Sequence, residues 1–125
     1  MDSNYKFPER YIQARSYLGK TVGIIIDRPL GSAHPKHPDM IYPVNYGYIP
    51  NTVGGDSEEL DVYLLGLNKS VTEYEAKVIG IVHRKNDNED KLIAAPDGIS
   101  LSKEEIENAI SFQEKYFDHM IEILL

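Results

Sequence analysis

The 125-residue chain contains no cysteine and no tryptophan, and its apolar runs are short. The absence of cysteine excludes disulfide scaffolds, thiolate catalysis and zinc sites built on cysteine. A run such as residues 22–26, with Gly23 inside it, is far too short to span a membrane. The first five residues, MDSNY, show neither the basic nor the apolar stretch of a secretion signal. We therefore expect a cytoplasmic protein.

Basic residues are also scarce. Thirteen lysines and arginines stand against 20 aspartates and glutamates, which gives a formal net charge of −7. Because nucleic acids and anionic membranes are bound through basic surfaces, we expect neither as a partner. An acidic chain is commonly just a soluble one, but carboxylates can also be gathered to bind cations. The distribution of the carboxylates along the chain distinguishes these two interpretations.

The composition is that of a globular protein, with 42% hydrophobic and 26% charged residues. This length suits one domain of ordinary size. We expect a single domain over residues 1–125, made of an N-terminal arm (1–20), a barrel (21–96) and a helix (102–125).

The pattern predicts a mainly β fold with a C-terminal helix, in the α+β class. Five short apolar or alternating runs read as strands, at residues 21–27, 41–49, 60–67, 74–83 and 91–95. Strands of this length between polar loops are typical of a small β-barrel or sandwich. Ser102 and Glu105 form the pattern of a capping box, and apolar residues then recur at helical spacing as far as Leu124.

Two acidic groups are candidates for cation binding. Residues 56–61 (DSEELD) carry four carboxylates at the entry to a predicted strand, and residues 87–90 (DNED) directly precede Lys91. Carboxylate oxygens suit Mg²⁺ or Mn²⁺, although the spacing is not that of an EF-hand. Taken alone, each group is also well explained as a solvated loop or turn.

Other polar residues leave two interpretations open. Arg28 ends the most apolar strand, where it either pairs with Asp27 or presents its planar guanidinium to a phosphate. Tyr42, Tyr46 and Tyr48 alternate along one predicted strand, which is most simply a packed face. His34 and His37 would need a third ligand to hold zinc. The fingerprints of P-loop, dinucleotide-binding and serine hydrolase folds are missing.

Taken in order, four segments resemble the soluble family I inorganic pyrophosphatases. They are residues 27–29 (DRP), 42–48 (YPVNYGY), 56–61 (DSEELD) and 87–96 (DNEDKLIAAP), and residues 112–117 (FQEKYF) resemble the family's terminal helix more weakly. The resemblance implies an OB-like five-stranded barrel with a flanking helix. It also implies hydrolysis of pyrophosphate to two phosphates with Mg²⁺, or with Mn²⁺ as the alternative, and it is compatible with a homo-oligomer, which is common in the family.

The resemblance also assigns roles by position. It implies metal ligation by Asp56, Asp61, Asp87 and Asp90, with Glu89 as the alternative to Asp90. It implies that Glu58 acts near the attacking water as base or orienter. The implied contacts to phosphate oxygens are those of Arg28, Tyr46, Lys91 and Tyr116.

The chain departs from the family pattern in several places. Glu58 and Ser57 stand where the family has an aspartate and a glycine, and residues 1–20 do not match the family's N-terminal glutamate and lysine. Phe117 replaces a phosphate-binding lysine and is expected to pack in the apolar stripe. Residues 31–39 (GSAHPKHPD) form an insert, which is either a surface loop or a source of the missing positive charge through His34, Lys36 and His37.

Two alternatives to pyrophosphate hydrolysis remain at this point. One is hydrolysis of another small phosphoanhydride or phosphate ester by the same metal chemistry, because a fold does not fix its substrate. The other is a catalytically silent OB-like module that binds a metal ion or phosphate.

Overall fold

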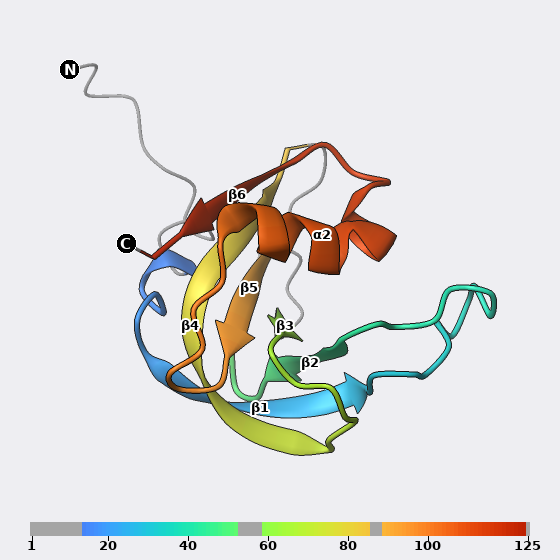
Figure 1. Cartoon of the computed structure of the whole chain (residues 1–125), viewed down its shortest axis with the longest axis horizontal. Coiled ribbons are helices and arrows are strands. Elements are labelled where there is room, and N and C mark those ends of the chain that lie inside the picture. Colours follow the sequence, from blue (N-terminus) through green and yellow to red (C-terminus); the bar gives the residue numbers. More distant parts are fainter. Residues whose placement is uncertain (1–13, 53–58, 86–88, 125) are drawn as a thin grey trace.

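A computed structural model describes residues 14–52, 59–85 and 89–124 (Figure 1). In chain order the strands and helix are β1 (Thr21–Arg28), β2 (Asn45–Ile49), β3 (Leu60–Leu64), β4 (Glu73–Arg84), β5 (Asp90–Ala95), α2 (Lys103–Glu114) and β6 (His119–Ile123). No helix in these ranges is long and apolar enough to cross a membrane.

The strands form one sheet that closes into a barrel. Their order is β1-β2-β3-β5-β4-β6, and β1 also pairs with β4, so that five strands complete the ring. The β3–β5 pair is parallel and the other pairs are antiparallel. The long β4 pairs with β5 along one edge. Along its other edge, residues 73–77 pair with β1 and residues 80–84 pair with β6. The expected five-stranded barrel is confirmed.

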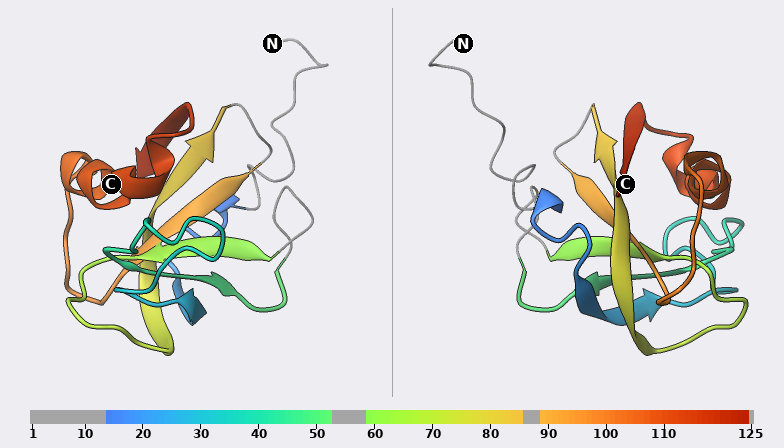
Figure 2. Two further views of the ribbon diagram at one scale, coloured as in Figure 1. Left: turned by 90° about the vertical axis from the view of Figure 1, so that its right-hand side faces the viewer. Right: turned by 60° about the vertical axis from the view of Figure 1, so that its left-hand side comes forward.

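The alternation of side chains along the strands creates two apolar clusters. On β3, Leu60, Val62 and Leu64 belong to the barrel core, whereas Tyr63 belongs to a second cluster together with Ile106 and Ile110 of α2. The helix therefore packs on the outside of the barrel (Figure 2). Because alternate residues of a strand face opposite sides, Asp61 shares the outer face with Tyr63.

The helix begins as predicted but ends earlier. Ser102 accepts a hydrogen bond from the Glu105 backbone N–H, and the Glu105 side chain accepts one from the Ser102 N–H. The prediction of one helix over residues 102–125 was wrong beyond Glu114, because residues 119–123 form β6. The second half of β4 exposes backbone groups that need partners, and pairing with β6 supplies them. The same apolar spacing suits the strand, where Ile121 is buried.

The remaining boundaries differ from the predictions by a few residues. The second strand starts at Asn45 instead of residue 41, since Pro43 has no N–H to donate to a neighbouring strand. Before it, the segment between β1 and β2 folds back on itself through a bridge between Ala33 and Ile41. Of the predicted N-terminal arm, residues 1–13 lie outside the described residues, and Ala14 is buried in the barrel core.

Gly47 of β2 lies opposite Ile26 of β1. A Cβ atom built at Gly47 would lie 1.8 Å from the carbonyl oxygen of Ile25 and 2.9 Å from the Cα of Ile26. Both neighbours are backbone atoms of β1, so no side-chain rearrangement could relieve the clash. The glycine between Tyr46 and Tyr48 thus allows the β1–β2 contact that positions both Arg28 and Tyr46.

We expect Gly47→Ala to lower the free energy of unfolding by about 3 kcal/mol, because the new methyl group forces the two strands apart. Urea denaturation monitored by circular dichroism measures this change. Gly23→Ala on β1 is the matched control, since nothing lies within 4 Å of its Cβ position. Its effect should stay within about 0.5 kcal/mol. Equal effects of the two substitutions would contradict the role given to Gly47.

Candidate active site

A cavity of about 760 Å³ opens on the outer face of the barrel, beside the C-terminal end of α2. Among the described residues, four lysine and arginine side chains and three aspartate and glutamate side chains line it. Positive and negative charges are therefore nearly balanced there, whereas the whole chain is strongly acidic. The described lining residues are Arg28, His34, His37, Asp39, Met40, Ile41, Tyr46, Asp61, Arg84, Glu89, Lys91, Phe112, Gln113, Lys115, Tyr116 and Phe117.

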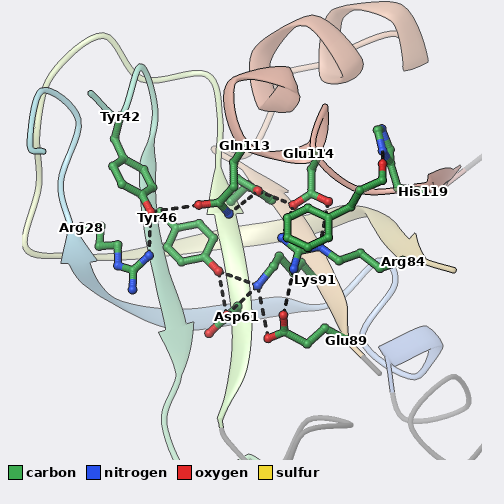
Figure 3. Close-up of polar contacts among 12 residues, drawn as sticks. Arg28, Tyr42, Tyr46, Asp61, Arg84, Glu89, Lys91, Gln113, Glu114 and His119 are labelled. Atoms are coloured by element: carbon green, nitrogen blue, oxygen red, sulfur yellow. Dashed lines mark hydrogen bonds and ion pairs between the residues drawn. The ribbon is translucent and has the colours of Figure 1, made fainter. Parts of the chain in front are cut away.

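Three side chains from neighbouring strands meet at the floor of this cavity (Figure 3). The Lys91 Nζ of β5 donates to Asp61 Oδ2 on β3 at 2.8 Å and to the Tyr46 hydroxyl on β2 at 2.7 Å. The Tyr46 hydroxyl in turn donates to Asp61 Oδ2 at 2.6 Å. Lys91 and Tyr46 are 3% and 5% exposed. Burial, and then the Asp61 carboxylate, raise the pKa of Tyr46 well above its usual range, so that it remains a hydrogen-bond donor at neutral pH.

Arg28 enters the cavity from the end of β1. Its Nη1 donates to the Tyr42 hydroxyl at 2.7 Å, and its guanidinium carbon lies 5.8 Å from the Tyr42 ring centroid and 5.6 Å from that of Tyr46. Two aromatic rings therefore orient this cation. Its place in the cavity favours the phosphate-facing interpretation of Arg28 over a simple pair with Asp27.

A chain of hydrogen bonds links Tyr42 to the end of α2 (Figure 3). The Tyr42 hydroxyl donates to Gln113 Oε1 at 3.0 Å, and Gln113 Nε2 donates to the Tyr63 hydroxyl at 2.7 Å. Tyr63 then donates to Glu114 Oε2 at 2.5 Å. Burial and the neighbouring Glu114 carboxylate raise the pKa of Tyr63, which keeps the phenol protonated as a donor.

Arg84 completes this series of hydrogen bonds on the other side of the cavity. Its Nε and Nη2 donate to the two carboxylate oxygens of Glu114 at 2.9 and 2.7 Å, and its Nη1 donates to Glu89 Oε2 at 2.9 Å. The guanidinium carbon lies 3.7 Å from the centroid of the Phe117 ring. Glu89 Oε1 lies 3.5 Å from Lys91 Nζ, so Arg84 connects the buried helix end to the floor of the cavity.

Burial alone would lower the pKa of Arg84 and raise that of Glu114. Their contacts with each other outweigh this effect, so the pKa of Arg84 is raised and that of Glu114 is lowered. Both groups are therefore charged at neutral pH. Sequence reasoning missed this pair together with Tyr63 and Gln113. One signal was present, since Glu114 interrupts the apolar stripe of the helix between Ile110 and Phe117.

The structure brings together four of the predicted site residues that it describes, namely Arg28, Tyr46, Asp61 and Lys91. Tyr116 lines the outer edge of the same cavity and is 66% exposed. The predicted residues Asp56, Glu58 and Asp87 lie outside the described residues.

The side chain of Asp90 does not lie with these four predicted residues. It faces the same side of β5 as Leu92, in the barrel core, and its Oδ1 lies 3.2 Å from His83 Nδ1. Glu89 and Lys91 take the opposite side because side chains alternate along the chain. Of the two residues that the resemblance left open for one ligand position, Glu89 is the one in the cavity.

The insert at residues 31–39 forms part of the opposite wall of the cavity. His34 and His37 both line it, with ring centroids 4.9 Å apart, and the His34 ring stacks on Tyr42 at 6.2 Å. Burial, Arg28 and His37 lower the pKa of His34. Lys36 is exposed, and its backbone N–H donates to His34 Nδ1 at 3.0 Å.

Two carboxylates of the cavity could contribute oxygen ligands to a hard divalent cation. Asp61 and Glu89 present carboxylate oxygens to it, and each lies beside Lys91, whose positive charge a bound cation could replace. Within the described ranges no cluster of three or more His, Asp or Glu side chains could hold a metal ion. Three of the predicted acidic residues fall outside those ranges.

The family model described as inorganic pyrophosphatase matches residues 22–122, and the chain belongs to this family. A curated inorganic pyrophosphatase from Saccharolobus solfataricus is 47% identical over 62 residues, which are 46% of this chain and 36% of that protein. One from Helicobacter pylori is 28% identical over 111 residues, which are 76% of this chain and 61% of that protein. The chain spans about a third of the length of the first of these relatives.

Solved structures support the fold. A crystal structure of inorganic pyrophosphatase from Ehrlichia chaffeensis superposes with a TM-score of 0.65 over 85% of this chain and 87% of that chain, at 19% identity. One from Neisseria gonorrhoeae gives 0.56 over 78% of this chain and 74% of that chain, at 26% identity. The barrel with its outer helix is thus the fold of inorganic pyrophosphatases.

We expect Glu114→Gln to lower the free energy of unfolding at pH 7 by about 3 kcal/mol, because it removes one partner of a buried ion pair. The pKa of Glu114 lies below its ordinary value of 4.5, so its stabilising contribution is present above that pH and is lost as the pH falls through the folded-state pKa. The difference from the unsubstituted protein should therefore shrink between pH 7 and pH 3.

Urea denaturation at several pH values measures this difference. Glu75→Gln, at an exposed carboxylate of β4, is the control and should follow the profile of the unsubstituted protein. A constant difference at all pH values would show that Glu114 does not act through its charge.

Proposed function

We propose that this chain hydrolyses inorganic pyrophosphate to two phosphates with a divalent cation, Mg²⁺ in the first place and Mn²⁺ as the alternative. Family membership supports this proposal. The observation that carries it is the meeting of Lys91, Asp61, Tyr46 and Arg28 in one cavity, because these residues lie at the positions that the resemblance assigns to metal and phosphate binding.

The charges of the cavity suit this substrate. Pyrophosphate is a compact polyanion, so a site that contains carboxylates binds it through cations. Arg28 offers a planar guanidinium for phosphate oxygens, and Tyr46 and Tyr116 offer hydroxyl donors. Lys91 neutralises Asp61 in the structure, and it can turn to a phosphate oxygen once a cation occupies that carboxylate.

Asp61 and Glu89 are the proposed metal ligands among the described residues. Asp56 and Asp87, outside those residues, are proposed to complete the set. A bound divalent cation lowers the pKa of its water and neutralises charge on the phosphates. Glu58 is proposed to orient the attacking water and to accept its proton. Arg28 and Lys91 then hold the two phosphates while the bridging oxygen leaves.

Release of phosphate from pyrophosphate in Mg²⁺, Mn²⁺ and EDTA tests the proposal. We expect turnover with either metal and none in EDTA. Asp61→Asn should lower kcat/KM by about 100-fold or more, because it removes a charged ligand and one of the two carboxylates beside Lys91. Asp97→Asn, at an exposed loop residue, is the matched control with unchanged kinetics. Binding of pyrophosphate without turnover would instead favour a silent binding module.

A second pair of variants tests which carboxylate near Lys91 serves the metal. Glu89→Gln should raise the Mg²⁺ concentration for half-maximal activity by about tenfold, because it removes an oxygen ligand in the cavity. Asp90→Asn should leave that concentration unchanged and affect only stability, through its contact with His83. Titration of activity with Mg²⁺ measures the effect of each substitution. The reverse result would indicate that Asp90, and not Glu89, is the metal ligand.

A further inference from the structure

The cavity has two parts of different chemistry. Its floor is polar and buried, with Tyr46, Lys91 and Arg84 each at most 5% exposed. Its mouth lies between the loop that precedes β2 and the residues at the end of α2, where apolar and aromatic side chains lie beside His34, His37, Asp39 and Lys115. We define the mouth as Met40, Ile41, Phe112, Tyr116 and Phe117, which all line the cavity.

The five side chains of the mouth are apolar or aromatic, and two of them are well exposed. Ile41 is 52% exposed and Tyr116 is 66% exposed, and they come from the loop before β2 and from the residues after α2. Figure 1 shows the loop and the C-terminal end of α2 on the same side of the barrel. Exposed apolar side chains beside convergent polar groups are typical of sites for organic ligands.

The volume of the cavity also suits an organic ligand. A cavity of about 760 Å³ lies within the range of roughly 300–1,000 Å³ that holds drug-sized molecules. Ten ordered waters around bound cations would occupy about 300 Å³, at about 30 Å³ each. Pyrophosphate adds only two phosphate groups and gains nothing from contact with Ile41 or Met40. Contact with these two side chains would favour only a substrate that carries an organic group.

We propose that this site also hydrolyses an organic diphosphate that carries an aromatic group, such as a nucleoside diphosphate. This inference rests on the proposed function, because the diphosphate lies on the same floor beside Arg28 and Lys91. The aromatic group lies in the mouth, where the Tyr116 ring offers a face for stacking and Ile41 covers the other side. The ammonium of Lys115, 5.3 Å from the Tyr116 ring centroid, adds positive charge at the same edge.

The reaction is the same displacement at phosphorus. The oxygen of a water forms a bond to the terminal phosphorus, and the bond from that phosphorus to the bridging oxygen breaks. The bridging oxygen keeps the electron pair and leaves as part of the nucleoside monophosphate. The water contributes its oxygen to inorganic phosphate and releases its proton to the base or to solvent, and no oxidant or second substrate is needed.

The test compares adenosine diphosphate and pyrophosphate as substrates of the whole chain with Mg²⁺, measured as released phosphate. We expect turnover of both, and loss of both in Asp61→Asn, which excludes a contaminating hydrolase. In Ile41→Ser, the ratio of kcat/KM for adenosine diphosphate to that for pyrophosphate should fall about tenfold, the effect of removing apolar contact with a ligand. Ile99→Ser, an exposed isoleucine outside this cavity, should keep the ratio of the unsubstituted protein.

The outcomes separate this inference from the proposed function. Turnover of pyrophosphate without turnover of adenosine diphosphate overturns this inference and leaves the proposed function intact. A ratio that Ile41→Ser does not change overturns the placement of the aromatic group in the mouth, and with it the inference. Absence of turnover with both substrates overturns the proposed function as well.

Discussion

The buried ion pair between Arg84 and Glu114 is the contact on which the geometry of the site depends. Glu114 is fully buried at the end of α2, and both of its oxygens accept hydrogen bonds from Arg84 on β4. Either partner alone would be a buried charge without compensation, which is strongly unfavourable. The pair therefore fixes the end of the helix on the barrel, and with it the places of Gln113, Phe117 and, through Arg84, Glu89.

The barrel was largely predictable, because five short runs with alternating or continuous apolar residues leave few other folds. The end of the helix was not. Apolar spacing over residues 117–124 fits a helix and a strand alike. The edge of β4 that does not pair with β5 decides between them, because its second half needs a partner. That decision is a tertiary one, since β4 and β6 lie far apart in the sequence. The spacing of Ser102 and Glu105, a local signal, placed the start of the helix correctly.

The candidate site was also predictable only in part, where its residues belong to motifs of fixed spacing. Arg28, Tyr46, Asp61 and Lys91 could be found through their motifs, which have fixed spacing along the chain. The choice between Glu89 and Asp90 needed the register of β5, because neighbouring residues of a strand face opposite sides. The Arg84–Glu114 pair joins two elements that share no motif, so a single sequence offers only the buried carboxylate in an apolar stripe as a sign of it.

The closure of the barrel through β1 and β4 has a consequence for when the cavity forms during folding. Arg28, Lys91 and Glu114 come from distant parts of the chain. Lys91 meets Asp61, and Glu114 meets Arg84, only after distant segments have come together. Contacts between distant segments form slowly, because the entropy of closing long loops must be overcome first. The floor of the cavity is thus assembled late, and a nascent or nicked chain with most of its strands formed still lacks this arrangement of side chains.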